Sequence, residues 1–185
     1  MEPENFNPLF SKVDVSQPTQ IQEWVNVVAE KEGRIDVIIS NVTSLSMADD
    51  ALSWKSAFEV DLLGTTTLVN AALPHLESNK GSIIPILSVS GIDVDFTATS
   101  PYGACKAVVT HYTAQLARTL APKGVRANTV SPGNFYIEDG VWGGIKTGNP
   151  ELFESQLERT RWEEWDTQKR LPMPLCFLPA RTPPS

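Results

Sequence analysis

Apolar and polar positions follow two different spacings along the chain, and the order of these spacings predicts its elements. Short, mostly apolar runs such as residues 35–39 are typical of strands buried on both faces of a parallel sheet. Longer segments with apolar residues at helical spacing, such as residues 17–32, are typical of helices packed on a core. These patterns predict strands at 10–15, 35–39, 83–87 and 125–130, and helices at 17–32, 54–76 and 101–120.

The predicted strands alternate with helices, which implies right-handed crossovers and a parallel sheet. We therefore expect an α/β fold with a Rossmann-like, doubly wound sheet. In such sheets, ligands bind beyond the carboxyl ends of the strands. The residues at or just beyond the ends of the predicted strands are Asp14, Asn41, Ser88 and the Pro132–Gly133 loop. A functional site is therefore expected near these residues.

Composition and charge exclude several classes of protein. No apolar run reaches the ~18 residues that a membrane helix needs, and the first ten residues lack the pattern of a signal peptide. The net charge of −7 opposes nucleic-acid binding, because phosphates repel an acidic surface. Cys105 and Cys176 have no spacing typical of metal ligands. We expect a cytoplasmic protein with no metal, no nucleic-acid partner and no membrane partner.

Tyr102 and Lys106 are the first candidates for chemistry. They are four residues apart on a predicted helix, so their side chains face the same way. A free tyrosine has a pKa near ~10, and a nearby positive charge stabilises the phenolate. Such a tyrosine can exchange a proton with an alcohol oxygen. The same spacing also occurs by chance on helix surfaces, where a tyrosine simply stacks beside a lysine.

Three further candidates lie at predicted strand ends, and each has an ordinary structural alternative. Ser88 can donate a hydrogen bond to a substrate oxygen, or only close its strand. Asn41 can contact a cofactor ribose, brace the sheet edge or form an Asx turn. Asp14 can contact an adenine edge, although the following Ser16 also fits the N-cap of the next helix.

Four motifs, in this order, resemble the short-chain dehydrogenase/reductase family. Residues 33–43 (GRIDVIISNVT) resemble G-x-I-D-V-L-V-N-N-A-G, and residues 81–91 (GSIIPILSVSG) resemble G-S-I-V-N-I-S-S-x-x-G. Residues 102–106 (YGACK) match Y-x-x-x-K, and residues 124–133 (GVRANTVSPG) resemble G-I-R-V-N-x-V-S-P-G. The resemblance covers most of residues 11–138. It implies an oxidoreductase that uses NADP or NAD to interconvert an alcohol and a carbonyl.

The resemblance also implies a role for each matching residue. Tyr102 corresponds to the proton donor, Ser88 to the serine that orients the carbonyl, and Lys106 to the lysine that holds the cofactor ribose. Asp61 replaces the family's helix asparagine, which orders a water leading to the lysine, and it adds a negative charge near Lys106. Phe135 replaces an aliphatic residue that packs on the nicotinamide.

Two other family positions differ in this chain. Thr43 replaces the small glycine of the N-N-A-G motif, and Ile137 replaces a threonine that contacts the carboxamide.

Both ends of the chain differ from the family. The resemblance implies that the chain starts just before the family's third strand, so that the glycine-rich phosphate-binding turn, the first two strands and the last strand are missing. Strand 35–39 would then lack a neighbour. We expect a partial NAD(P)-binding domain at 1–158 and an atypical tail at 159–185, which is rich in Trp, Arg and Pro.

The tail has two interpretations. It is either a disordered or partner-binding segment, or a frameshifted translation. Suitable codons for the residues from Glu163 onward, read in a shifted frame, would encode a sequence that resembles the family's next segment. That sequence is R-M-G-(H/Y)-P-E-E-I-A-D-A-V-V-F-L-A-S-P.

The leading hypothesis is an NAD(P)-dependent oxidoreductase that acts on a small molecule. A fungal-type resemblance near the Pro132–Gly133 loop favours a secondary metabolite as the substrate. The alternative is an inactive remnant that acts as a subunit-interaction module, because helices matching 54–77 and 101–120 pair with a partner subunit in the family. The same helices would make a homo-oligomer. Residues 62–65 (LLGT) also suggest the extended branch of the family, whose members modify sugar nucleotides. The Ser131–Gly133 loop argues against this branch.

Overall fold

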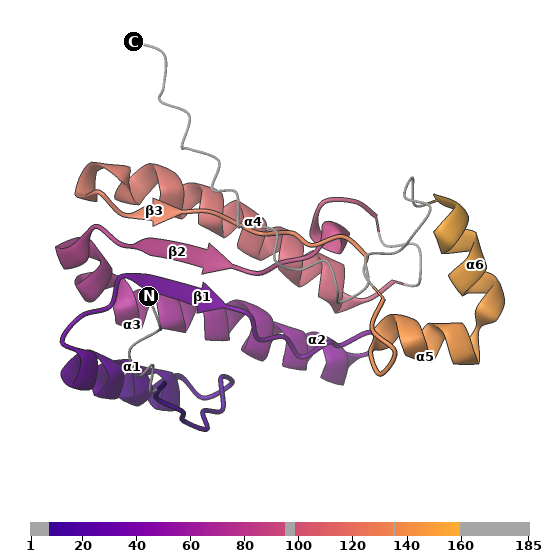
Figure 1. Cartoon of the computed structure of the whole chain (residues 1–185), viewed down its shortest axis with the longest axis horizontal. Helices are drawn as coiled ribbons and strands as arrows, with labels where there is room; N and C mark the ends of the chain where they lie inside the picture. The colour runs from indigo at the N-terminus through magenta and orange to yellow at the C-terminus, as the bar shows by residue number, and fades with distance from the viewer. Residues whose placement is uncertain (1–7, 95–98, 135, 160–185) are drawn as a thin grey trace, which may run out of the picture. The chain divides into compact units, whose positions relative to one another are not determined.

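A parallel sheet organises the first unit of the chain, which ends at Ser131. The computed structural model describes residues 8–94, 99–134 and 136–159. The described strands are β1 (Val37–Ser40), β2 (Ser82–Pro85) and β3 (Arg126–Ala127), paired in the order β1-β2-β3 (Figure 1). Ile38 lies beside Ile83, and Ile83 lies beside Ala127. The expected α/β class and the incomplete parallel sheet are confirmed.

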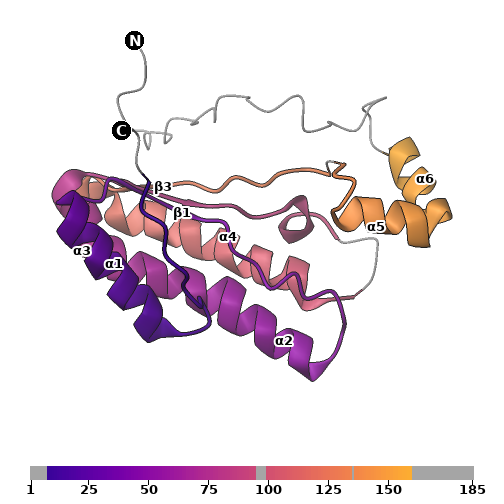
Figure 2. The same cartoon turned by 60° about the horizontal axis from the view of Figure 1, so that its bottom comes forward.

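Helices cover one face of this sheet, as Figure 2 shows for α1, α3 and α4. The first, α1, begins with a proline in its first turn and ends at Gly33, whose φ of 73° is the left-handed conformation that favours glycine. The next, α2, begins after Asp50, whose carboxylate accepts a hydrogen bond from the Ser53 N–H. Their bounds are α1 (Pro18–Glu32), α2 (Ala51–Ala57), α3 (Thr65–Asn79) and α4 (Pro101–Leu120).

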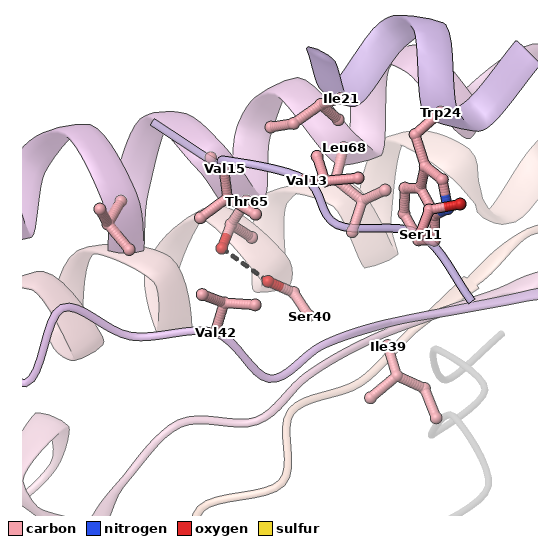
Figure 3. A pocket seen from close by; sticks show the side chains of 12 residues that line it. Ser11, Val13, Val15, Ile21, Trp24, Ile39, Ser40, Val42, Thr65 and Leu68 are labelled. Atoms are coloured by element: carbon pink, nitrogen blue, oxygen red, sulfur yellow. Dashed lines mark hydrogen bonds between the residues drawn. The ribbon is translucent and has the colours of Figure 1, made fainter. Parts of the chain in front are cut away.

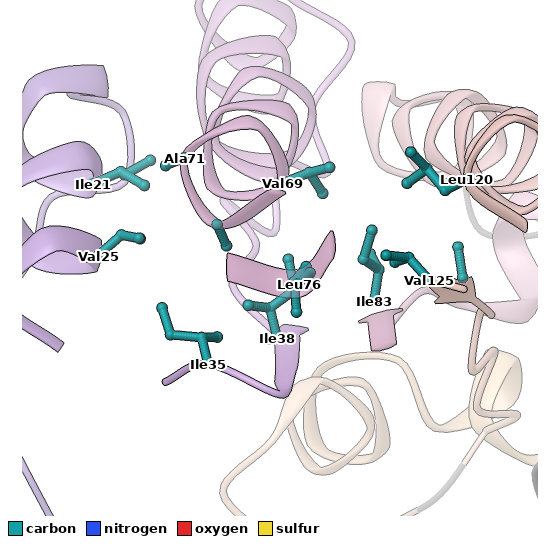
Figure 4. Close-up of a cluster of buried hydrophobic side chains, with 12 residues drawn as sticks. Ile21, Val25, Ile35, Ile38, Val69, Ala71, Leu76, Ile83, Leu120 and Val125 are labelled. Carbon is teal, nitrogen blue, oxygen red and sulfur yellow. The ribbon is translucent and has the colours of Figure 1, made fainter. Parts of the chain in front are cut away.

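The core lies between the sheet and these helices (Figure 4). Ile38 and Ile83 face it from the strands, while Ile21 faces it from α1 and Leu76 from α3. Leu76 is fully buried, which fixes the end of α3 against the sheet. The contact between α1 and α3 also positions α1 beside this core.

The predicted strand at 10–15 is wrong, because these residues form no strand in the structure. Val13 and Val15 still pack against the core, which explains their apolar spacing. A strand needs a ladder partner, however, and no described strand lies beside this segment. The segment instead approaches the helix layer, where a Cβ on Gly64 would lie 2.9 Å from the Val15 carbonyl oxygen.

The other predicted elements are present, and the helix at 101–120 has its predicted bounds, whereas the others are shifted or shortened. The predicted helix at 54–76 begins earlier, at Ala51, and is interrupted by a π-helix at Phe58–Gly64. The predicted strand at 125–130 shortens to β3, followed by an isolated bridge between Ile86 and Val130.

The second unit begins at Pro132, and its described residues form two further helices. They are α5 (Val141–Gly148) and α6 (Pro150–Arg159). The Phe153 ring makes edge-on contacts with Tyr136 and Trp142, at centroid distances of 5.9 and 6.4 Å. The predicted tail lies outside the described residues from position 160 onward. Among the described helices, none is long and apolar enough to cross a membrane.

Replacing Leu76 by alanine tests this description of the core. Leu76→Ala removes a fully buried side chain and is expected to lower the free energy of unfolding by about 3 kcal/mol. Urea unfolding followed by circular dichroism measures the change. The matched control is Leu52→Ala on α2, whose side chain is 80% exposed and whose loss is expected to cost no more than about 0.5 kcal/mol. Equal costs for the two variants would contradict this core.

Candidate active site

Tyr102 and Lys106 lie in the first turns of α4 and face the same direction. Pro101 opens this helix, since its fixed φ suits the first helical position. The Tyr102 side chain is half-buried, whereas the Lys106 side chain is only 5% exposed. The Lys106 Nζ atom lies 5.5 Å from the centroid of the Tyr102 ring. The helix therefore holds a cation beside the tyrosine, away from most of the solvent.

The turn after β2 packs directly against this part of α4. Ser88 starts a short 3₁₀ helix (Val89–Gly91), and its Oγ accepts a hydrogen bond from the Ser90 N–H at 3.2 Å. Two glycines permit the close approach. A Cβ on Gly103 would lie 2.5 Å from the Ser90 carbonyl oxygen, and one on Gly91 would lie 2.7 Å from the Lys106 Cβ. The serine turn and the tyrosine–lysine helix thus form one packed unit.

Asp61 forms a buried ion pair with Lys106. Its Oδ1 lies 3.1 Å from the Lys106 Nζ, and the two side chains are 2% and 5% exposed. Asp61 comes from the π-helix, an element that often occurs at functional sites. The negative charge expected near Lys106 is therefore in direct contact with it. Each charge depends on the other, because an unpaired charge at this depth would be costly.

The loop after β1 supplies the remaining partners of Asp61. The Thr43 hydroxyl donates to Oδ1, while the Ser44 N–H and hydroxyl donate to Oδ2 at 2.9 and 3.0 Å. Both carboxylate oxygens thus accept hydrogen bonds, which hold the carboxylate in position. Thr43 and Ser44 were not among the predicted site residues. The sequence did contain one signal for Thr43. The family has glycine at position 43 and asparagine at position 61, whereas this chain has threonine and aspartate. The threonine hydroxyl can donate a hydrogen bond to the aspartate carboxylate.

Cys105 lies beside this ion pair but has a different chemical character. Burial raises the pKa of its thiol, the nearby Asp61 charge raises it further, and Lys106 opposes them. A thiol with a raised pKa is a poor nucleophile, because the thiolate is the reactive form. Among the described residues, no cluster of His, Cys, Asp and Glu could hold a metal ion.

Asp14 and Asn41 lie on other loops. The hydroxyl and the N–H of Ser16 both donate to the Asp14 carboxylate, and these hydrogen bonds lower its pKa. Asp14 thus shapes the turn before α1. Asn41 directly follows β1 and is exposed. Among the described residues, no hydrogen bond or ion pair joins either side chain to Tyr102 or Lys106. Phe135 lies outside the described residues.

Comparison with known proteins identifies the family. The sequence model for "short chain dehydrogenase" matches residues 2–138. The chain belongs to the short-chain dehydrogenase family. It is 38% identical over 144 residues to isoepoxydon dehydrogenase of Penicillium expansum, and the match covers 77% of this chain and 56% of that enzyme. It is 34% identical over 165 residues to L-fucose dehydrogenase of Mus musculus, covering 86% of this chain and 59% of that one.

Solved structures of short-chain dehydrogenases resemble this chain in fold. The match to a short-chain dehydrogenase/reductase from Burkholderia xenovorans has a TM-score of 0.75 and 26% identity, and covers 84% of this chain and 62% of that one. The match to ElxO with NADP bound has a TM-score of 0.75 and 25% identity. It covers 86% of this chain and 65% of ElxO. The chain therefore spans less than two thirds of each relative compared.

The buried ion pair predicts a large difference between two acid-to-amide substitutions. Asp61→Asn leaves the Lys106 ammonium buried without a counter-charge and is expected to lower the free energy of unfolding by about 3 kcal/mol. Glu77→Gln removes the partner of Lys123 in an ion pair near the surface, where the Glu77 and Lys123 side chains are 30% and 52% exposed, respectively. It is therefore expected to lower the free energy of unfolding by less than about 1 kcal/mol. Urea unfolding measures both changes.

A second substitution separates the lost charge pair from a general packing defect. Adding Lys106→Met to Asp61→Asn removes the unpaired ammonium and is expected to recover part of the lost stability. If Asp61→Asn costs no more than Glu77→Gln, or if Lys106→Met recovers nothing, the ion pair does not have this role.

Proposed function

We propose that this chain is the catalytic part of an NAD(P)-dependent oxidoreductase that interconverts an alcohol and a carbonyl on a small molecule. The observation that supports this most directly is the packed unit of Ser88, Tyr102 and Lys106. The Lys106 ammonium lies 5.5 Å from the Tyr102 ring centroid, and the serine turn is held against the same helix. Family membership supports the same reaction class.

Each of the three side chains has a distinct task in this proposal. The Tyr102 hydroxyl gives a proton to the carbonyl oxygen during reduction and takes it back during oxidation. The Ser88 hydroxyl donates a hydrogen bond to the same oxygen and stabilises the charge that develops on it. Lys106 holds a positive charge beside the Tyr102 ring. Asp61, with Thr43 and Ser44, fixes the Lys106 ammonium in place.

The described residues offer contacts to two parts of a nicotinamide dinucleotide. Lys106 and Tyr102 would hold the nicotinamide ribose, with Asn41 close to the carboxyl end of β1, and Asp14 would meet the adenine end. When bound, the cofactor supplies the hydride. The described part of the chain contains no glycine-rich turn leading into a helix, the element that binds pyrophosphate. These residues therefore account for the ribose contact but not for the phosphate contact.

The relatives support both the cofactor and the class of substrate. ElxO is described with NADP bound, which supports NADP or NAD for this chain. Several relatives are named for small molecules, namely isoepoxydon, L-fucose and meso-2,3-butanediol. A secondary metabolite is thus one candidate substrate. We place the protein in the cytoplasm, where reducing conditions suit the free Cys105 thiol.

Removing one hydroxyl tests the proposed reaction. Tyr102→Phe deletes the proton donor and is expected to lower turnover at least about 100-fold, with NADPH or NADH binding unchanged. The matched control is Tyr112→Phe, because Tyr112 lies further along the same helix and packs against the core. Turnover is followed at the nicotinamide absorbance, and binding is followed by fluorescence. Retained turnover in Tyr102→Phe, or no cofactor binding by the unmodified chain, contradicts the proposal.

A second proposed function is self-association through the helices at 54–77 and 101–120. Large apolar side chains are exposed there: Phe58 is 49% exposed, Leu63 41%, and Val108, on α4, 48%. Because α2 and the π-helix both contact α4, these side chains come from adjacent helices. Exposed apolar groups on neighbouring helices are typical of a subunit interface. A remnant without catalytic activity would keep this surface.

One charge placed on this surface tests the interface. The unmodified chain is expected to sediment as a dimer, and Phe58→Glu is expected to shift it to a monomer by burying an unpaired carboxylate. Val27→Glu is the control, because Val27 lies on α1 and is 41% exposed. A chain that sediments as a monomer at every concentration, or a dimer that survives Phe58→Glu, contradicts this interface.

A further inference from the structure

The loop that joins β1 to α2 is fixed at both of its ends. At its start, a hydrogen bond of 2.8 Å joins the hydroxyls of Ser40 and Thr65 (Figure 3). At its end, the Asp50 carboxylate caps α2 by accepting a hydrogen bond of 2.8 Å from a backbone N–H of the first turn. Between these points, the Ser44 hydroxyl donates to Asp61. The loop therefore has a defined position beside the buried ion pair.

Leu45, in the same loop, has an unfavourable backbone conformation. Its φ of 49° lies in the left-handed region, which suits glycine or asparagine better than leucine. The Leu45 N–H donates to the Thr43 hydroxyl oxygen at 3.2 Å, and the same hydroxyl donates to Asp61. Backbone strain persists where surrounding contacts impose it, and it is frequent at ligand-binding sites. The contacts around Asp61 thus hold an apolar side chain, 44% exposed, next to the candidate active site.

Further exposed apolar residues follow the serine turn. A Cβ on Gly91 would lie 2.7 Å from the Lys106 Cβ, so this turn lies directly against the lysine. Ile92 comes next in the chain, and Ile92 and Val94 are 67% and 96% exposed. Together with Leu45, they place apolar surface beside both members of the ion pair.

The charges of the same region oppose an anionic ligand. Lys106 supplies the positive charge beside Tyr102, and the Asp61 carboxylate already pairs with it at 3.1 Å. Asp49, in the loop of Leu45, and Asp93, directly after Ile92, are exposed carboxylates. A carboxylate or phosphate on a substrate would be repelled by these groups and would compete with Asp61 for Lys106.

We propose that Leu45 and Ile92 are specificity-determining residues that select an uncharged carbonyl compound with an apolar ring or chain next to the reacting carbonyl. Exposed apolar patches with a polar rim are typical of ligand-binding grooves. Apolar substrate surface would be buried against these side chains, whereas a charged group would lose its hydration without a new partner. The inference rests on the proposed function, because it requires that Tyr102 acts on a carbonyl.

Two ketones with the same ring test this selection, namely 4-oxocyclohexanecarboxylate and its methyl ester. The whole 185-residue chain is assayed at neutral pH with NADPH and with NADH. The kcat/KM for the methyl ester is expected to exceed that for the carboxylate at least about tenfold. Equal values, or a preference for the carboxylate, would overturn the inference.

Leu45→Asn removes the apolar contact and keeps the loop, because asparagine tolerates the left-handed conformation. It is expected to raise the KM for the methyl ester roughly fivefold and to leave kcat nearly unchanged, the pattern of a lost contact that substrate and transition state share. The matched control is Leu52→Asn, because Leu52 on α2 is 80% exposed. If Leu45→Asn leaves the KM unchanged, Leu45 does not contact the substrate.

Ile92→Lys reverses the charge preference at the other loop. The added ammonium is expected to raise kcat/KM for the carboxylate at least about fivefold and to lower it for the methyl ester, so the ratio of the two falls. Leu52→Lys is expected to leave that ratio unchanged. Circular dichroism shows whether each variant folds. A ratio that is the same in Ile92→Lys and Leu52→Lys contradicts the role of Ile92.

Binding measurements separate a failure of this inference from a failure of the proposed reaction. If the chain reduces neither ketone with either cofactor, the proposed reaction is contradicted. Saturation-transfer NMR of the two ketones then decides the specificity by itself. Stronger binding of the methyl ester, weakened by Leu45→Asn, supports the inference. Equal binding of both ketones, or binding of neither at millimolar concentration, overturns it.

Discussion

The contact between Asp61 and Lys106 is the interaction on which the candidate site depends. It joins three parts of the chain that are distant in sequence: the π-helix, the first turns of α4 and the loop after β1. Because both charges are buried, neither group can move independently without a large energetic cost. The position of the lysine beside Tyr102 is therefore set by the tertiary structure and not only by their spacing on one helix.

The sequence predicts the parts of this site that depend on local spacing. Tyr102 and Lys106 share a helical face because they are four residues apart, and Ser88 follows a buried strand. The hydrogen bonds from Thr43 and Ser44 to Asp61 could not be predicted in the same way. They connect residues that are 17 and 18 positions apart and depend on how the loop after β1 packs against a helix.

The fold shows the same difference between local and long-range information. Helix ends such as Gly33 are predictable because a left-handed residue is a local requirement. The strand predicted at 10–15 is wrong because alternation of side chains is local, whereas a strand exists only with a neighbour. Val13 and Val15 are nevertheless packed against the core. The alternation of apolar residues therefore predicted their burial correctly, although the strand itself is absent. Val13 and Val15 of this segment line a pocket together with Ile39 of β1.

The π-helix at Phe58–Gly64 has a consequence for how this region can change in evolution. A π-turn contains more residues than an α-turn, so the helical faces before and after it are out of phase with a single continuous α-helix. The orientation of Asp61 is thus partly independent of the face that α3 presents to the core. The loss of one residue in this segment would restore a regular helix and rotate Asp61 relative to Leu76. A single-residue deletion in this segment would therefore turn a different side chain toward the lysine while the core face of α3 stayed the same.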